Sequence, residues 1–279
     1  MKLYRPAGST AEGPFDPVIT PQSAGWGFCG LRVVNLDGSQ SVSTQDSETL
    51  VLPLSGSCTV SVDGETFELR GRTGVFDAVT DFAYLPRDVQ ATITGTGRFA
   101  LPSARTRKRL PARYGPAEHV PVELRGAGNC SRQVNNYCLP HTFEADQLLV
   151  CEVLTPGGNW SSYPPHKHDE AREGESVLEE IYYFEVGRDG MGYQRVYGTS
   201  ERPIDVLAEV RTGDVVLIPH GWHGPSMASP GYDLYYLNVM AGPGPERAWL
   251  ICDDPAHAWV RQTWESAGVD PRLPFGGTT

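Results

Sequence analysis

The 279-residue sequence lacks the features that mark disulfide-rich, membrane-spanning and secreted proteins. The six cysteines include no Cys-x-x-Cys pair and no dense framework of bridges, so we expect reduced thiols. No window approaches the roughly 18 to 20 apolar residues that cross a bilayer, and the first residues lack the apolar stretch of a secretory signal. These absences predict a cytoplasmic protein without a membrane partner.

Positive charge is also scarce. Lysine and arginine number 23 against 34 aspartates and glutamates, which gives a formal net charge of −11. A field of this sign repels phosphates, and the sequence therefore argues against nucleic acid or an anionic membrane as a partner. One basic run, from Arg105 to Arg109, interrupts the acidity, and we interpret it as a solvated linker.

Histidine is absent from residues 1–118, and all seven histidines follow from His119 onward. An imidazole metal site therefore cannot be assembled from the N-terminal part alone. The chain has instead 31 glycines and 23 prolines, a composition that suits many tight turns between short strands.

Short apolar runs recur between turn signals from about residue 28 to residue 100. One run ends at Val62 before Asp63-Gly64 and another begins at Thr66, which predicts a tight β-hairpin. Between roughly 102 and 128 the pattern gives way to Pro, Arg, Gly and Ala, and we expect an irregular connection there. Strand-like runs resume at 147–153, 180–186, 214–218 and 233–239, and a short helix is expected within 254–268.

This rhythm predicts an all-β protein of the sandwich or barrel type. A chain of 279 residues can bury a substantial core as one large unit or as two domains. We divide it into an N-terminal β-barrel, residues 1–118, and a C-terminal domain, residues 119–279.

The segment that ends at His168 carries the first chemical signal. His166 and His168 stand two residues apart, and on an extended chain such residues project from the same face. Pro164 and Pro165 keep the segment extended and out of a helix, as two imidazoles that bind one ion require. A His-x-His pair alone is weak evidence for a metal site.

A carboxylate in a second segment strengthens this signal. Glu179 and Glu180 begin an apolar and aromatic run in which an unpaired charge would be costly to bury, and a metal would remove that cost. Period-two alternation lets only one of the two glutamates face the histidines, and the alternation does not say which. A third segment, from Gly213, ends in a Pro-Gly turn that presents His223.

Three imidazoles and one carboxylate, without a thiolate, suit a divalent cation. We expect one ion, Zn²⁺ in the first place, with Mn²⁺, Fe²⁺ and Ni²⁺ as alternatives that ligand type does not separate. His220 lies in the Pro-Gly turn and is interpreted as a surface residue, and the remaining histidines have no supporting pattern.

The chain resembles the cupin superfamily at these positions. The first cupin motif is matched by His166, His168 and Glu180, and the second by Gly213, Pro219, Gly221 and His223. The match has departures: Trp160 stands where the first motif wants glycine, the closing asparagine of the second motif is missing, and the spacing from His168 to Glu180 is longer than usual.

Longer runs carry a more specific resemblance. The segments 155–169, 178–180, 194–197 and 235–243 are similar to the 5-deoxy-glucuronate isomerases of inositol catabolism. The resemblance implies a bicupin, with two double-stranded β-helix (jelly-roll) barrels, a short C-terminal helix and no metal site in the N-terminal barrel. It also implies a sugar-acid substrate, a homo-oligomer in some members, and four metal ligands: His166, His168, Glu180 and His223.

The implied reaction is the aldose-ketose isomerisation of 5-deoxy-D-glucuronate to 5-dehydro-2-deoxy-D-gluconate. A divalent ion would polarise the substrate carbonyl and stabilise the developing enediolate. A hydride shift would need no general base, whereas a proton transfer would. The candidates for that base are Glu179, Lys167, Tyr182 and Asp169. Arg195 and Arg132 are candidates for binding the substrate carboxylate, because a guanidinium fork matches two oxygens.

Two other functions stay open on the sequence alone. The same ligands can bind Fe²⁺ and activate oxygen, which would make the protein a metal-dependent cupin dioxygenase. In a non-enzymatic sugar-acid-binding cupin, the metal would only orient a ligand.

Overall fold

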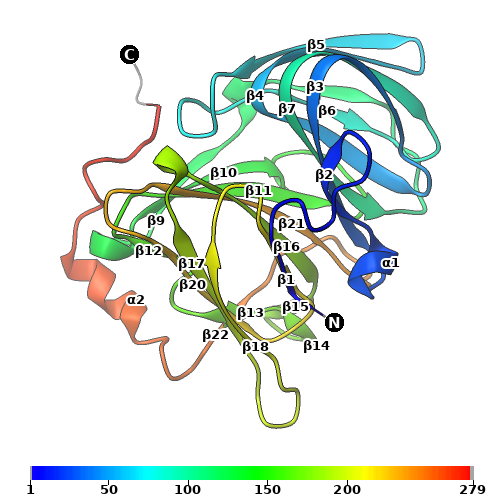
Figure 1. The fold of residues 1–279 in the computed structure, drawn as a ribbon. Helices are drawn as coiled ribbons and strands as arrows, with labels where there is room; N and C mark the ends of the chain where they lie inside the picture. The colour runs from blue at the N-terminus through cyan, green and yellow to red at the C-terminus, as the bar shows by residue number, and fades with distance from the viewer. Residues whose placement is uncertain (1, 277–279) are drawn as a thin grey trace.

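Two β-barrels lie side by side in the computed structural model, which describes residues 2–276 (Figure 1). The N-terminal barrel is an antiparallel seven-stranded sheet in the order β2-β3-β7-β4-β6-β8, with β5 paired to β4. Its strands are β2 (Phe15–Ile19), β3 (Cys29–Ser43), β4 (Ser47–Val62), β5 (Glu65–Arg72), β6 (Phe82–Leu85), β7 (Gln90–Arg105) and β8 (Arg113–Gly115).

The C-terminal barrel is built from two larger sheets and a small hairpin. The seven-stranded sheet has the order β1-β19-β16-β21-β11-β10-β9, and the six-stranded sheet has the order β18-β17-β20-β13-β22, with β12 paired to β20. The strands are β1 (Tyr4–Arg5), β9 (Val122–Arg125), β10 (Arg132–Cys138), β11 (Leu149–Thr155), β12 (Trp160–Ser161), β13 (His166–Lys167), β16 (Glu179–Val186), β17 (Gly192–Tyr197), β18 (Asp205–Val210), β19 (Val215–Ile218), β20 (Trp222–Ala228), β21 (Leu234–Ala241) and β22 (Cys252–Asp253), and the hairpin is β14 (Asp169–Arg172) with β15 (Glu175–Val177).

Helices are few and short in the described residues. The α-helices are α1 (Pro21–Ala24) and α2 (Val260–Thr263), and the 3₁₀ turns are η1 (Ala117–His119), η2 (Gly128–Cys130), η3 (Gly187–Asp189) and η4 (Trp264–Ser266). The predicted all-β class with one short C-terminal helix is confirmed. No helix in residues 2–276 is both long and apolar enough to span a membrane.

The hairpin predicted at Asp63-Gly64 joins β4 to β5. Both turn residues have positive φ, 51° and 83°, which the tight turn of a two-residue hairpin requires. The predicted irregular connection from 102 to 128 is wrong in part, because β7 continues to Arg105 and both β8 and β9 fall inside it. Pairing with β3 and β4 on its two sides extends β7 beyond its apolar pattern.

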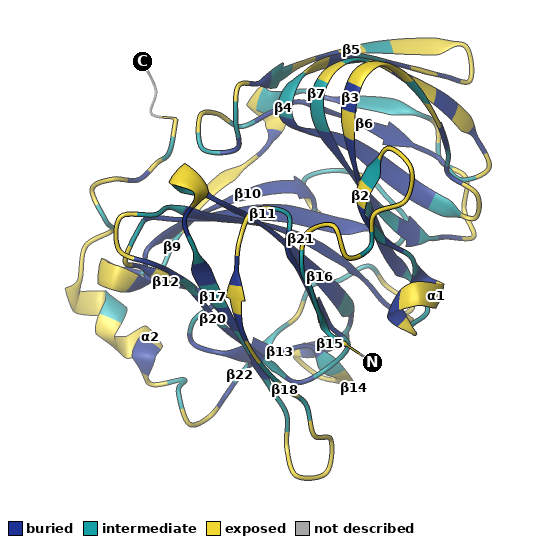
Figure 2. Cartoon of the chain, in the orientation of Figure 1, coloured by how far each residue is buried: buried dark blue, intermediate teal, exposed yellow. Residues whose placement is uncertain are grey.

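The strands that lie between the barrels divide their side chains between two cores, as β16 shows. Ile181 and Tyr183 of β16 pack in a core shared with Leu50 and Leu52 of the N-terminal barrel. Tyr182, between them, packs inside the C-terminal barrel. The strands between the barrels, such as β16 and β21, are therefore buried on both faces, as their dark colour shows (Figure 2).

Two glutamates link the barrels in a reciprocal way. Glu48, at the start of β4, accepts hydrogen bonds of 2.6 to 3.0 Å from the backbone N–H groups of residues 146–148, just before β11. Glu179, at the start of β16, accepts bonds of 2.6 to 2.9 Å from the N–H groups of residues 27–29, at the start of β3. The neighbour order β3-β7-β4-β6 of one barrel thus corresponds to β11-β21-β16-β19 of the other.

A buried ion pair also crosses the interface between the barrels. The Arg72 guanidinium donates two hydrogen bonds, of 2.9 and 2.8 Å, to the Glu152 carboxylate, and both side chains are inaccessible to solvent. Tyr137 and Asn135 donate two further bonds to Glu152, so its charge is compensated.

The division of the chain at residues 118 and 119 stays a prediction. The strands follow it with one exception, because β1 pairs with β19 in the sheet of the C-terminal barrel, with Tyr4 opposite Val216. The start of the chain thus completes the edge of the second barrel.

Candidate metal centre

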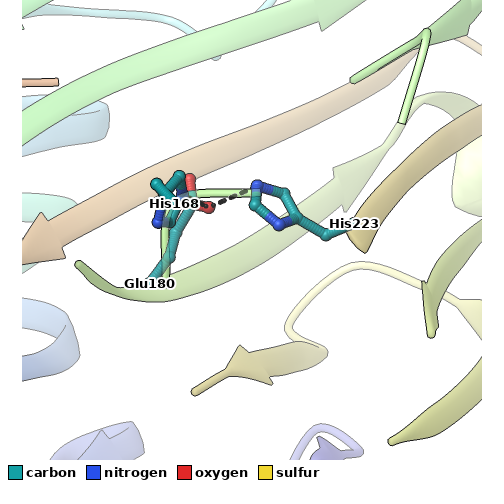
Figure 3. Close-up of side chains that lie close together, drawn as sticks. All are labelled: His168, Glu180 and His223. Carbon is teal, nitrogen blue, oxygen red and sulfur yellow. Dashed lines mark hydrogen bonds and ion pairs between the residues drawn. The ribbon is translucent and has the colours of Figure 1, made fainter. Parts of the chain in front are cut away.

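Three of the predicted ligands come together inside the C-terminal barrel. His168 follows β13, Glu180 is the second residue of β16, and His223 is the second residue of β20. All three are buried, at 2%, 1% and 0% exposure. The Nε2 atoms of His168 and His223 lie 3.0 and 3.1 Å from the same oxygen, Glu180 Oε2 (Figure 3).

Hydrogen bonds from behind set the orientation of each side chain. His168 Nδ1 lies 3.2 Å from the carbonyl oxygen of Leu178, and His223 Nδ1 lies 3.2 Å from that of Gly221. An Nδ1–H that donates to a carbonyl leaves Nε2 as the nitrogen free to bind a metal. Asn238 donates a 2.8 Å hydrogen bond to Glu180 Oε1, which leaves Oε2 directed at the histidines.

The residues present fit a divalent cation. One ligand atom from each of His168, Glu180 and His223 lies within 4.8 Å of the other two. His223 Nε2 is buried and makes no hydrogen bond of acceptable geometry, which is a costly state for a polar atom. An ion at this point would use that nitrogen, and the imidazole and carboxylate set is one that first-row divalent metals accept.

The electrostatics of the group favour an ionised Glu180 carboxylate. Burial acts to lower the pKa of His168, but the hydrogen bond to Glu180 and the charge of Glu180 outweigh this and raise it. Burial acts to raise the pKa of Glu180, but the charge of His223 and hydrogen bonds from both histidines outweigh it and hold the pKa at about 2. Burial lowers the pKa of His166 well below its ordinary value, and the charges of His223, His168 and Arg132 act in the same direction. Glu180 is therefore ionised at neutral pH, and His166 is not protonated.

His166, the fourth predicted ligand, stands beside this group of three. It lies opposite His223 in the pairing of β13 with β20, and the two ring centroids are 4.3 Å apart. Its ring is 6.4 Å from that of His168, and it lies outside the group whose ligand atoms are mutually within 4.8 Å. Its role as a ligand stays a prediction.

Lys167 and Glu179 lie away from the histidines. Lys167 Nζ is 2.7 Å from a carboxylate oxygen of each of Asp169, Glu170 and Glu175. Glu179 is bound by the three N–H groups of residues 27–29, on the face opposite Glu180. Of the two adjacent glutamates, only Glu180 faces the histidines. The structure therefore does not bring either predicted base into the centre.

Tyr182 is the predicted catalytic residue that the structure places next to the centre. Its ring stacks on that of Tyr236, at 4.8 Å between centroids, and lies 6.1 Å from the ring of His223. Its hydroxyl is 3.1 Å from Ser162 Oγ. Burial, and then the charge of Glu180, raise the pKa of Tyr182 well above its ordinary value, so the hydroxyl keeps its proton.

The two candidate arginines differ in their surroundings. Arg195 pairs with the exposed Asp205 and donates to two backbone carbonyls. Arg132 is 7% exposed and donates to the Cys130 carbonyl at 3.1 Å, with its guanidinium 5.4 Å from the centre of the Trp264 ring. No carboxylate of the described chain lies within 4 Å of it, and burial lowers the pKa of Arg132 to about 10.

Asn238 was not among the predicted site residues, although it is bonded to the Glu180 carboxylate. Its signal in the sequence is a polar side chain in the apolar run 234–241, on the same face as Tyr236. The register places it opposite Tyr182 on β16 and Cys151 on β11.

Two tandem jelly-roll barrels, one with a buried histidine and glutamate centre, define the class of bicupins with a candidate metal site. The chain belongs to the KduI/IolB family, whose model matches residues 3–260. The resemblance identified from the long sequence runs is thereby confirmed.

Curated relatives of the chain carry one name. A 5-deoxy-glucuronate isomerase of Geobacillus kaustophilus is 45% identical over 94% of this chain and 96% of its own length. That of Geobacillus thermodenitrificans is 44% identical over 88% and 90%, respectively. That of Bacillus subtilis strain 168 is 38% identical over 87% and 91%.

Solved structures agree with the fold. An IolB-like protein from Salmonella typhimurium LT2 is 36% identical, with a TM-score of 0.86 over 93% of this chain and 99% of that one. Oxalate decarboxylase of Bacillus subtilis, a protein with Mn(II) centres, is 11% identical, with a TM-score of 0.62 over 90% and 79%. The second likeness concerns the cupin fold alone.

Proposed function

We propose that the protein is a metal-dependent aldose-ketose isomerase that converts 5-deoxy-D-glucuronate to 5-dehydro-2-deoxy-D-gluconate. The observation that carries the proposal is the identity of 44 to 45% with curated 5-deoxy-glucuronate isomerases over most of both chains. The buried group of His168, Glu180 and His223 supplies a centre of the kind that such a reaction needs.

His168, Glu180 and His223 would hold the ion, with His166 as a fourth ligand. When bound, a divalent ion would polarise the substrate carbonyl and stabilise the negative charge that develops on oxygen. We propose Zn²⁺, with Mn²⁺, Fe²⁺ and Ni²⁺ as alternatives, since imidazole and carboxylate ligands suit all four. Elemental analysis of the purified protein separates them.

Tyr182 is proposed to transfer a proton at a substrate oxygen. The alternatives Glu179, Lys167 and Asp169 are occupied by backbone N–H groups or by opposite charges. A raised pKa keeps the Tyr182 hydroxyl protonated, so it can donate to an oxygen whose charge increases in the transition state. Ser162 Oγ lies 3.1 Å from this hydroxyl and can donate to it, which leaves the proton of Tyr182 for the substrate oxygen.

Arg132 is proposed to bind the substrate carboxylate. A buried guanidinium with a single backbone acceptor has donors to spare, and a carboxylate matches two of them. Gly126 leaves room for this group, because a Cβ there would lie 2.7 Å from Arg132 NH1. Arg132 lies two residues before Val134 on β10, and Val134 packs in the same core as Tyr182, which supports a position of Arg132 on the interior face of the barrel.

The decisive experiment is incubation of metal-replete protein with 5-deoxy-D-glucuronate without oxygen, followed by NMR identification of the product. The proposal requires a ketose of unchanged mass. Oxygen-dependent turnover would instead indicate a dioxygenase, and binding without turnover a sugar-acid-binding protein.

The cytoplasm remains the proposed compartment, supported by six cysteines that form no disulfide in the structure. A homo-oligomer is proposed from the family resemblance, and sedimentation of the purified protein tests it.

A further inference from the structure

The N-terminal barrel has a position that corresponds to the metal ligand Glu180. Glu48 and Glu179 are equivalent because each binds the N–H groups that open the other barrel. The next residues, Thr49 and Glu180, are therefore equivalent, and both point into the interior of their barrels. Thr49 pairs with Ser103 on β7, as Glu180 pairs with Met240 on β21.

The same register places an arginine beside this threonine. Gly30 on β3 lies opposite Ser103, as Leu149 on β11 lies opposite Met240. Two residues further along, Arg32 takes the place that Cys151 holds in the C-terminal barrel. A guanidinium thus projects into the N-terminal barrel where the other barrel has a thiol.

These residues line a cavity of about 170 Å³, which we call the N-terminal cavity; its lining includes Gly30, Arg32, Thr49, Ser103 and Arg105. Gly30 helps to keep it open, because a Cβ there would lie 2.7 Å from Ser103 Oγ. A cavity of roughly 150 Å³ accommodates a molecule of the size of benzene. The space therefore suits a small metabolite of a few carbon atoms.

Two polar groups at the cavity lack the partners that burial demands. Thr49 is 1% exposed, and its Oγ1 atom makes no hydrogen bond. Arg32 donates to the Ser43 carbonyl at 3.2 Å and lies 5.3 Å from the centre of the Phe15 ring, but no carboxylate of residues 2–276 lies within 4 Å. Burial lowers the pKa of Arg32, and the opposing charge of Glu12 does not offset this.

The charges of the cavity select the kind of ligand. Arg105 is paired with Asp46, 3.2 Å away, so that Arg32 supplies the net positive charge. One guanidinium fork matches the two oxygens of a carboxylate, and the threonine hydroxyl can bond the carboxylate or a neighbouring hydroxyl group. A dianion would meet the Asp46 carboxylate at the rim.

We propose that the N-terminal barrel binds a small carboxylate anion in the N-terminal cavity, through the Arg32 guanidinium and the Thr49 hydroxyl. This barrel then carries a ligand site in the place where its partner barrel carries the metal centre. The inference is independent of the reaction proposed for the C-terminal barrel.

The test is calorimetric titration of the metal-replete protein with D-glycerate, a small hydroxy acid. We expect a binding event that Arg32→Met weakens by about tenfold to a hundredfold, the range for loss of a charge-assisted pair. Arg32→Lys, which keeps the charge without the fork, is expected to weaken it less. Arg70→Met, at an exposed position on β5, is the control and should leave the event unchanged.

A second variant protects the test against a folding defect. Thr49→Val keeps the shape and removes the unsatisfied hydroxyl, so it should raise the melting temperature of the ligand-free protein while weakening D-glycerate several-fold. The two opposite shifts separate a binding role from a structural one. A lower melting temperature with unchanged binding would contradict the proposed role of Thr49.

Arg132→Met, in the C-terminal barrel, shows which of the two barrels binds D-glycerate. The proposal requires the binding of D-glycerate to be unchanged in Arg132→Met and to be weakened by about tenfold to a hundredfold in Arg32→Met. It is overturned if Arg132→Met abolishes the event while Arg32→Met retains it, or if wild-type protein binds no D-glycerate at about 50 mM. Stronger binding of inorganic phosphate than of D-glycerate would also overturn the choice of a carboxylate.

Discussion

The two barrels share a strand order and differ in a few interior side chains. In each barrel a glutamate at the start of the equivalent strand, Glu48 or Glu179, accepts hydrogen bonds from the backbone of the opposite barrel. The next residue decides the chemistry, because Glu180 faces two histidines and Thr49 faces an arginine. The comparison shows that equivalent strands keep the same contact between the barrels while single residues on their inward faces differ.

Glu180→Gln should have the largest effect on this comparison. The amide would bind a divalent cation poorly, and we expect loss of bound metal with a fall in kcat/KM of roughly 1000-fold. Metal analysis and initial rates measure both. Glu68→Gln, exposed on β5, is the control. Full metal content and activity in Glu180→Gln would contradict a metal centre at Glu180.

Tyr182→Phe tests the proposed proton transfer by Tyr182, a residue on the interior face of the barrel next to the metal centre. We expect kcat to fall by roughly 100-fold, within the range for loss of a proton-transfer group. The melting temperature should change little, because a single 3.1 Å hydrogen bond to Ser162 is lost. A kcat within threefold of wild type, with metal retained, would exclude this role.

Arg132→Met should lower kcat/KM for 5-deoxy-D-glucuronate by about tenfold to a hundredfold, because a charge-assisted pair is lost. The uncharged analogue 5-deoxy-D-glucose should be affected far less. Arg195→Met should cost much less with the acid, since Asp205 and carbonyls occupy that guanidinium. Equal losses on acid and analogue would show that Arg132 only supports the fold.

Glu48→Gln and Glu179→Gln sharpen the comparison at the interface. Each removes the charge that three backbone N–H groups share, and we expect each to lower the free energy of unfolding by about 2 kcal/mol. Denaturant titration measures both variants. If Glu179 were the general base, Glu179→Gln would lose kcat by orders of magnitude while Glu48→Gln would not.

The smallest expected effect concerns Asp146, whose backbone N–H donates to Glu48. Burial acts to raise its pKa, but hydrogen bonds from Lys108 and Thr106 outweigh this and lower it. A carboxyl group with a lower pKa in the folded state adds stability above its unfolded pKa of about 3.9, and this is lost as the pH falls further. Thr106→Val should therefore cost about 1 kcal/mol at pH 7 and less at pH 3, by denaturant titration. An equal cost at both pH values would contradict the linkage.

Local sequence periodicity accounts for much of the fold. The Asp63-Gly64 turn, the apolar runs of β16, β19 and β21, and the His-x-His pair are short-range signals, and the structure has strands where they predict them. The same alternation that joins His166 to His168 implies that Lys167 points away, as it does. The sequence was silent where distant pairing decides, as in the extension of β7 by β3 and β4.

Strand alternation alone did not separate Glu179 from Glu180, and only the family resemblance favoured Glu180; nor did it separate Arg132 from Arg195. Both glutamates are compatible with the strand pattern, and the N–H groups of residues 27–29, some 150 positions away, claim one of them. Arg195 and Arg132 both begin or lie within strands, and only their burial and their partners distinguish them.

The pairing of β1 with β19 has a consequence for how the two barrels can be separated. A fragment that starts at residue 119 would lose Tyr4 and Arg5, and β19 would become an edge strand with unpaired N–H and C=O groups. Such an edge recruits strands from other molecules. A C-terminal barrel expressed alone would therefore tend to self-associate, whereas a circularly permuted chain that keeps residues 2–6 next to it would not.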